Sequence, residues 1–525
     1  ASAPWGTSPE YRPLELERLA LGSRVRVIDS RICEIDRDAK AVVLPDDSIV
    51  PYDTLVITTG LQDQTAARLG ADRADAWQLA QRVFSVSDAT GNQFLEAAAL
   101  ELARDAQAGS EDLALVYGDT VEALASINGL LARGVPGSNI IHVRPGHNSI
   151  IDDVGAESLI ADALSAAGVT TRTRCQIVQA QGDEDGSGVT VVLEDTPAGG
   201  ADEPARQAVR CALLITGDVP DVDRSLFAAV NGCGLPYDGR LVVDHKFRTT
   251  QHDIYAGGSI AKYARRYRAP HWLQQFNSRE AGAALGYSVL SELDPLMSSE
   301  GGADMDEEAR GPSSLQRFVL PRRTSAVLPG GHVFLRSTLA TVDMGAAGRE
   351  LVTNVSADDS DNGKSHFTRL RLDRYGRLAT LIYCGNDRVE VGNLCRLVGR
   401  HSGFMNGVER DLDAGVIKDL IVYFRLDWAY AIYHDLFDYL CLELRESLAD
   451  DDHLQALLQA TWEDVDKGGS DTFLRKQRDQ NVGPFGSKLH PSTRKKIEAG
   501  VLDFLRANKT LLPMYFLPSR GSDKK

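Results

Sequence analysis

The sequence predicts an α/β fold in which parallel strands alternate with helices, followed by a β-rich α+β region and C-terminal helices. Residues 113–147 read as strand, tight turn, helix and strand, the pattern of a βαβ unit. Two further hydrophobic strands, at 53–60 and 213–217, each end in Thr-Gly. Short strands and turns then dominate residues 315–397, and apolar residues at helical spacing dominate residues 407–448.

The composition bounds the class of protein. With 525 residues, 43% hydrophobic and 25% charged, the chain is long enough for several domains with ordinary cores. Its net charge of −17 disfavours nucleic acid and anionic membrane as main partners. We expect no membrane span, since no apolar run reaches the necessary length, and no N-terminal signal segment, since no charged and then apolar pattern opens the sequence. Its seven cysteines form no C-x-x-C pair, which favours a reducing compartment and argues against a redox disulfide.

The N-terminal region is predicted to be β-rich and ends in the run YDTLVITTG at Gly60. This run resembles the second half of the FAD domain in flavoproteins with two dinucleotide-binding domains. In that family the strand end lies beside the flavin dinucleotide, so the resemblance makes Gly60 a candidate FAD-binding position. The first half of such a domain is not found in the chain, and we expect the chain to be the C-terminal part of a longer protein, because a half-sheet would expose an unpaired edge.

The βαβ unit carries an altered glycine fingerprint. Where G-x-G-x-x-G places three glycines, this chain has Gly118, Thr120 and Ala123. Gly118 keeps the turn and Ala123 is small enough for helix–strand packing. Thr120, however, puts a β-branched side chain where a pyrophosphate would approach the backbone. The unit is therefore predicted to serve packing, with ligand binding lost.

The residues at the end of the second strand are compatible with one dinucleotide. The acidic residue that would bind a ribose 2′-hydroxyl is replaced by His142-Val143-Arg144. Arg144 would suit a 2′-phosphate, so NADP remains an alternative.

A second flavoprotein motif is altered near residue 259. The run IYAGGSIA resembles the family's isoleucine-tyrosine-alanine-alanine-glycine-aspartate motif, whose aspartate binds the flavin ribityl chain. The matching positions are Gly258 and Ser259, and a serine supplies no carboxylate. The resemblance thus implies an FAD site that has lost an anchor, so the expected cofactor is none, with FAD or NADP as the alternatives.

The predicted organisation has six parts. They are a partial FAD-domain-like region and connection at 1–110, an NAD(P)-binding-like Rossmann domain at 111–217, a return to the FAD-domain-like region at 218–295, an acidic linker at 296–312, a β-rich interface or dimerisation-like domain at 313–406, and a helical C-terminal region at 407–525. No metal site is expected, because His434-Asp435 has no second set at ligand spacing.

The helical run GVIKDLIVYFRLDWAYAIYHDLFDYLCLELRESL, with the motifs above, resembles the C-terminal part of the cilia- and flagella-associated protein 61 family. That resemblance implies a structural axonemal protein of motile cilia and flagella. It implies membership of the calmodulin- and spoke-associated complex at the radial spoke base, with its other subunits, radial spoke base proteins and the doublet microtubule as partners. The Rossmann-like FAD/NAD(P)-binding body would then be a scaffold without catalytic residues.

Two further functions remain as alternatives. An NAD(P)H-dependent FAD oxidoreductase would tolerate Thr120 and Ser259 and carry a bound flavin. A nucleotide sensor would bind NADP through Gly118 and Arg144 without turnover.

Overall fold

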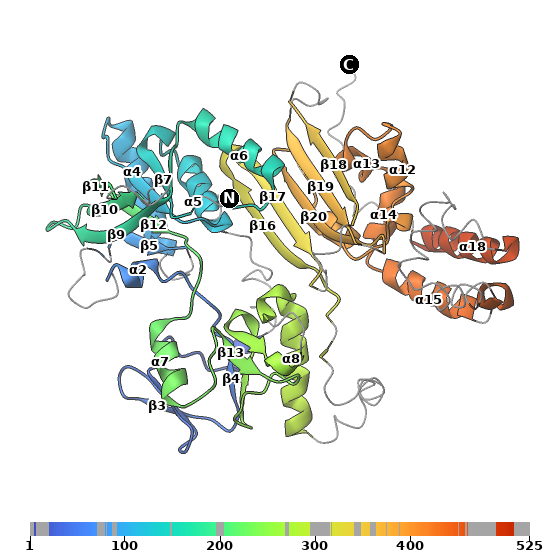
Figure 1. Cartoon of the computed structure of the whole chain (residues 1–525), viewed down its shortest axis with the longest axis horizontal. Helices are drawn as coiled ribbons and strands as arrows, with labels where there is room; N and C mark the ends of the chain where they lie inside the picture. Colours follow the sequence, from blue (N-terminus) through green and yellow to red (C-terminus); the bar gives the residue numbers. More distant parts are fainter. Residues whose placement is uncertain are drawn as a thin grey trace. The chain divides into compact units, whose positions relative to one another are not determined.

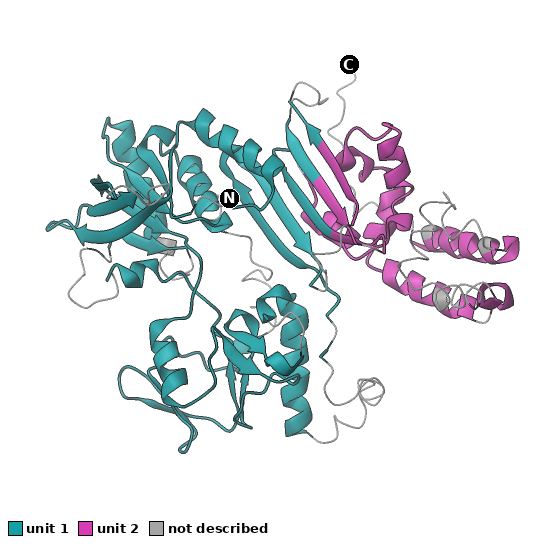
Figure 2. Cartoon of the chain, viewed as in Figure 1, with its two compact units in different colours: residues 1–342, 354–368, 380–388 teal, residues 343–353, 369–379, 389–525 magenta. Residues whose placement is uncertain are grey.

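A computed structural model of the chain gives the fold. It describes residues 5–6, 20–70, 79, 81–86, 92–146, 150–195, 204–267, 272–294, 315–316, 318–340, 348–357, 364–373, 375–387, 389–449, 451–456, 459 and 490–508. The chain divides into two compact units (Figure 2). Unit 1 holds residues 1–342, 354–368 and 380–388, and unit 2 holds residues 343–353, 369–379 and 389–525. The predicted linker at 296–312 lies outside the described residues.

A five-stranded parallel sheet forms the Rossmann-like layer of unit 1. Its order is β5-β12-β6-β7-β8, and every neighbouring pair in it is parallel. The strands are β5 (Val83–Ser85), β6 (Ala114–Tyr117), β7 (Ile140–Arg144), β8 (Thr170–Thr173) and β12 (Leu213–Thr216). Strands β6 and β12 are buried along their whole length and mostly apolar, as expected for parallel strands that are covered on both faces.

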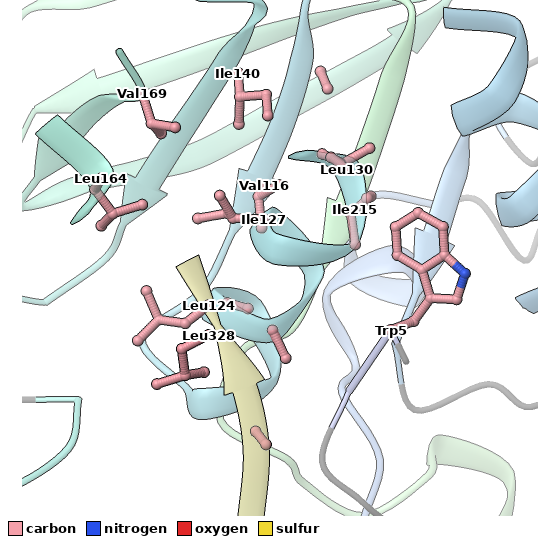
Figure 3. Close-up of a cluster of buried hydrophobic side chains, with 14 of the residues drawn as sticks. Trp5, Val116, Leu124, Ile127, Leu130, Ile140, Leu164, Val169, Ile215 and Leu328 are labelled. Carbon is pink, nitrogen blue, oxygen red and sulfur yellow. The ribbon is translucent and has the colours of Figure 1, made fainter. Parts of the chain in front are cut away.

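Three helices complete this layer. They are α4 (Asn92–Gln107), α5 (Val121–Ala132) and α6 (Val154–Ala167). Helix α6 is capped by the Asp153 side chain and ends at Gly168, whose φ is +80°. Figure 3 shows Val116 and Ile215 of the sheet beside Ile127 of α5 in the core that joins the layers.

A smaller antiparallel sheet is inserted between β8 and β12. It consists of β9 (Cys175–Gly182), β10 (Val189–Asp195) and β11 (Arg206–Cys211), in the order β11-β10-β9. Burial alternates along β10, as expected for a sheet with one face on a core.

The FAD-domain-like part of unit 1 contains only short strands. An antiparallel sheet joins β1 (Glu34–Asp36), β2 (Ala41–Val43) and β3 (Ile49–Pro51). Two parallel pairs follow, β4 (Leu55–Ile57) with β14 (Ile254–Ala256), and β13 (Leu241–Val243) with β15 (Ala261–Tyr263). The helices of this part are α7 (Arg224–Gly232) and α8 (Ser278–Leu293), and the short helices α2 (Thr65–Arg68) and η3 (Gly258–Ile260) follow β4 and β14.

An antiparallel hairpin packs on the Rossmann-like layer within unit 1. Strands β16 (Arg322–Leu328) and β17 (His332–Thr338) pair through Pro329–Gly331, and β17 pairs with β20 (Leu378–Gly385). Leu328 and Phe334 belong to the same buried cluster as Leu124 of α5 and Leu164 of α6. Figure 1 shows β16 and β17 beside these helices. Part of the predicted β-rich region therefore shares a core with the Rossmann-like layer.

Unit 2 is mainly helical. Its helices are α11 (Val391–Leu397), α12 (Val408–Asp413), α13 (Leu420–Tyr423), α14 (Asp427–Tyr433), α15 (Phe437–Ala449) and α18 (Pro491–Ala507). Boundaries between the two units fall within strands β18 (Glu350–Val355) and β19 (His366–Leu372), so each strand is divided between the units. Within the described residues, no helix is both long and apolar enough to cross a membrane.

Candidate functional site

Gly118 follows β6 at the edge where the parallel strands end. Its φ of +141° is a conformation that side chains rarely adopt. A Cβ at this position would lie 2.2 Å from the carbonyl oxygen of Gly217, the residue that follows β12. The close approach of two strand ends is therefore enough to require glycine here, without any ligand.

Thr120 caps the N-terminus of α5. Its Oγ1 accepts a hydrogen bond from the backbone N–H of Ala123 at 3.2 Å, and it donates to the carbonyl oxygen of Gly217. Ala123 is fully buried, and a Cβ on Gly217 would lie 3.2 Å from its nitrogen. The turn after β6, the start of α5 and the end of β12 are thus joined by the protein's own groups.

Arg144 is held in an ion pair by the residue between Gly118 and Thr120. Its Nε lies 2.5 Å from Oδ1 of Asp119, and both side chains are only 15% exposed. The backbone N–H of Gly146 donates to Oδ2 of Asp119 at 2.6 Å. The structure therefore brings Arg144 to the fingerprint turn and pairs it with a carboxylate.

His142 of β7 supports the same turn. Its side chain is buried, and Nε2 lies 3.1 Å from the carbonyl oxygen of Gly118. Burial lowers the pKa of His142 to about 4, because the charged imidazolium would lose its hydration. The ring is therefore neutral at pH 7 and donates its Nε2–H to Gly118.

These contacts do not fit the pyrophosphate of a dinucleotide. Such a group binds backbone N–H donors at a helix N-terminus and is favoured by the positive end of the helix dipole. Here Thr120 already occupies one of those donors, and the carboxylate of Asp119 adds a negative charge beside them. Asp119 is the residue that the sequence analysis missed; the only signal in the sequence was an acid directly after the first glycine.

The FAD-like strand ends also come together. The parallel pair β4 and β14 places Gly60 near Ser259, and a Cβ on Gly60 would lie 3.3 Å from the Ser259 hydroxyl. Gly60 and Gly258 have φ values of +69° and +74°. The two strand ends thus lie together, but the side chain at the motif position, Ser259, carries a hydroxyl and no carboxylate.

The residues after Ser259 fill the interior of this part. Lys262 is buried and its Nζ lies 2.8 Å from Oδ2 of Asp238. Tyr263 is fully buried, with its ring 6.0 Å from that of Phe247 and 6.3 Å from that of Phe276. Burial raises the pKa of the Tyr263 hydroxyl, which stays protonated at neutral pH.

A groove of about 590 Å³ lies between α5, α6 and the strands β7 and β8. It is lined mainly by aliphatic and hydroxyl side chains: Leu124, His142, Arg144, Ile150, Val154, Glu157, Ser158, Ile160, Ala161, Leu164, Ser165, Val169 and Thr171. Its charged members are already engaged, since Arg144 pairs with Asp119 and Glu157 accepts from the Ile150 N–H at 2.7 Å.

The described part of the chain offers no metal-binding group of three His, Cys, Asp or Glu residues. The cysteines in this part of the chain are all free thiols. Burial raises the pKa of Cys211 and Cys384 to about 12, so neither side chain is a reactive thiolate at neutral pH. The candidate positions Gly60, Gly258 and Ser259 form one group, and Gly118, Thr120, Ala123 and Arg144 form another. Each is built from contacts that suit packing.

Comparison with known proteins yields two families. Residues 8–277 match the pyridine nucleotide-disulphide oxidoreductases, and residues 316–432 match the CFAP61 dimerisation domain. Cilia- and flagella-associated protein 61 of Tetrahymena thermophila is 22% identical over 638 residues, which cover 98% of this chain and 37% of that protein. The resemblance predicted from the sequence is confirmed, and the chain spans little more than a third of the relative's length.

Two solved structures align with most of the chain at low sequence identity. A covalent putidaredoxin reductase–putidaredoxin complex aligns at 14% identity with a TM-score of 0.49, covering 73% of this chain and 81% of that one. The ferredoxin reductase of the CYP199A2 system from Rhodopseudomonas palustris aligns at 16% identity with a TM-score of 0.49, covering 78% and 86%. The strand order and the family match confirm the predicted α/β fold class.

Proposed function

The chain belongs to the family of pyridine nucleotide-disulphide oxidoreductases, and from this premise we propose that it uses the family's fold as a structural part and not as an enzyme. One observation carries the proposal. The turn that would bind a dinucleotide is closed by Thr120, by the Asp119–Arg144 ion pair and by the approach of Gly217 to Gly118. Catalysis by a bound cofactor needs a preorganised site, and this one is filled by the protein itself.

We further propose that the chain is a structural axonemal component of motile cilia and flagella. Its predicted localisation in the cilium or flagellum agrees with the name of its curated relative. In this proposal it acts in the calmodulin- and spoke-associated complex at the radial spoke base, where it scaffolds spoke attachment and motility regulation. Its partners are other subunits of that complex, radial spoke base proteins and the doublet microtubule.

Cofactor binding is tested by spectroscopy on the purified protein. We expect no flavin absorbance, no change on adding FAD, and no tryptophan fluorescence change on titration with NADPH. A flavin spectrum that NADPH bleaches would overturn the structural proposal and establish an NAD(P)H-dependent FAD oxidoreductase. Saturable NADPH binding without flavin would instead establish a nucleotide sensor.

The closed turn can be tested by opening it. Replacing Thr120 with Gly and Asp119 with Ala removes the cap and the carboxylate, so any latent affinity for NADPH should rise in this double variant. The matched control replaces Asp46 with Ala, an exposed acid in a distant turn. Binding of NADPH by the unmodified chain at the same affinity as the double variant would show that Thr120 and Asp119 do not close the site.

The ciliary role is tested in cells that carry motile cilia. A fluorescently tagged chain is expected along the axoneme, and loss of the protein is expected to reduce the number of spokes attached per axonemal repeat in electron tomograms. Normal spoke numbers and normal beating without the protein would contradict the scaffold role, whatever the outcome of the cofactor measurements.

A further inference from the structure

Trp5 lies in a specific site on the Rossmann-like layer. Its side chain is only 7% exposed and joins the main buried cluster of unit 1, near Leu130 of α5 (Figure 3). Trp5 and Gly6 are described by the structure, whereas residues 1–4 and 7–19 are not. The first 19 residues show no periodic hydrophobic pattern, so the sequence did not predict a packed side chain among them.

Two charged residues bind the indole. The Arg133 guanidinium lies over the ring, with its carbon 3.9 Å from the ring centroid. The indole Nε1–H donates to Oε2 of Glu96 at 3.1 Å, and the Nε–H of Arg133 donates to the same oxygen at 2.8 Å. The hydrogen bond from Arg133 lowers the pKa of Glu96, so the carboxylate stays ionised as an acceptor. Arg133 thus contacts the face of the indole ring, and Glu96 binds the N–H group at its edge.

Helix α5 is shaped to receive this side chain. A Cβ on Gly129 would lie 2.8 Å from the indole, so the absence of a side chain there makes room for the ring. The hydroxyl oxygen of Ser126 lies 2.9 Å from the backbone carbonyl oxygens of both Trp5 and Glu122, which share its single proton. The next residue is also constrained, since a Cβ on Gly6 would lie 3.0 Å from Val86. The site therefore fits the dipeptide Trp-Gly.

We propose that Glu96, Ser126, Gly129 and Arg133 form a peptide-binding socket that recognises a Trp-Gly segment and is occupied in cis by residues 5–6. The socket holds Trp5 and Gly6 against α4 and α5. It accepts the same peptide in trans when Trp5 is removed. This inference is independent of the proposed function, because the socket uses neither candidate dinucleotide site.

The direct test measures peptide binding to a Trp5→Ala chain. A peptide of residues 1–12, ASAPWGTSPEYR, is titrated while the change in its tryptophan fluorescence is followed. We expect saturable binding with a shift of the emission to shorter wavelength. The same peptide with Trp5→Ala, followed by calorimetry, is expected not to bind. Absence of saturable binding of the tryptophan peptide to a folded Trp5→Ala chain would overturn the proposal.

Variants of the socket identify its members. In the Trp5→Ala background, Arg133→Ala or Glu96→Gln should weaken the peptide roughly tenfold or more, because each removes a stacking or hydrogen-bonding group. Gly129→Leu should abolish binding by filling the space of the ring. Arg104→Ala, an exposed arginine on the same helix as Glu96, is the matched control and should leave the affinity unchanged. Equal affinity in all variants would overturn the assignment of these residues.

A measurement on the unaltered chain keeps the proposal testable if the Trp5→Ala chain fails to fold. The difference between the fluorescence of the chain and that of a Trp5→Phe variant reports Trp5 alone. We expect this difference to resist acrylamide quenching, and to become quenchable after Gly129→Leu. A Trp5 signal that is quenched as freely as tryptophan in water would contradict the socket.

Discussion

At the scale of single residues, the fingerprint turn is held by side chains of the protein itself. Thr120 gives α5 the cap that a phosphate oxygen would otherwise supply, and Asp119 gives the adjacent loop its negative charge. Each of these side chains has a partner within the same turn or at its edge. The alteration is therefore a replacement of one set of contacts by another.

The cap of α5 should be measurable as stability. We expect Thr120→Ala to lower the free energy of unfolding by about 1 kcal/mol or somewhat more, because it removes both the cap and the bond to Gly217. Urea denaturation followed by circular dichroism measures this change. Thr120→Ser keeps the hydroxyl and should lose much less, and an equal loss in the two variants would show that the hydroxyl is not the stabilising group.

His142 should make the stability depend on pH. Its pKa is about 4 in the fold and about 6.5 when unfolded, so the unfolded chain binds more protons between these values. The contribution of His142 is constant above pH 6.5 and is lost as the pH falls towards 4, by on the order of 3 kcal/mol. Comparing denaturation midpoints of the chain and a His142→Gln variant at pH 7 and pH 4.5 isolates this loss. A parallel decline in both proteins would contradict it.

The contacts of these residues lay beyond the sequence analysis. Gly118 and Thr120 could be assigned to a turn because their neighbours have a clear local pattern. The partner of Thr120, Gly217, follows another strand 97 positions away, and the pairing of Arg144 with Asp119 spans two strand ends. Long-range contacts of this kind depend on strand order, which periodicity alone does not give.

At the scale of elements, the hydrophobic pattern predicted strands and helices but did not reveal where a helix is interrupted. The predicted strand, helix and strand at 113–147 appear as β6, α5 and β7. Among the strands and turns predicted for 315–397, β19 and β20 flank a turn that contains Gly376 at φ +77°. The helical spacing that dominates residues 407–448 does not form one helix from 412 to 424, because Gly415 adopts φ +69° and separates α12 from α13. The helical spacing of apolar residues continues across Gly415, so the spacing alone could not reveal the interruption.

The hairpin of β16 and β17 should behave as part of the Rossmann-like core. Leu328 is fully buried in the cluster shared with α5 and α6, so Leu328→Ala should cost about 2–5 kcal/mol. The same truncation at Val319, which is 62% exposed, is the control and should cost little. Chemical denaturation gives both values. A cost below about 1 kcal/mol at Leu328 would show that the hairpin is not integral to that core.

At the scale of the whole molecule, the net charge of −17 limits the partners. Phosphate backbones need a cationic surface, and the chain carries 74 acidic against 57 basic side chains. We expect no mobility shift of double-stranded DNA or RNA even at low salt, where such binding is strongest. A shift that weakens steeply with added salt would reveal a local basic surface that the totals conceal.

The filled turn has a further consequence for how this protein responds to the state of the cell. An enzyme that binds NADPH or FAD gains stability from it, about 4 kcal/mol when the ligand is a thousandfold above its dissociation constant. Under the function proposed above, a turn that carries its own hydroxyl and carboxylate gains nothing in this way. The stability of the Rossmann-like layer would then be independent of nucleotide supply, and a structure built on it would keep the same strength while the cell's reducing power rises and falls.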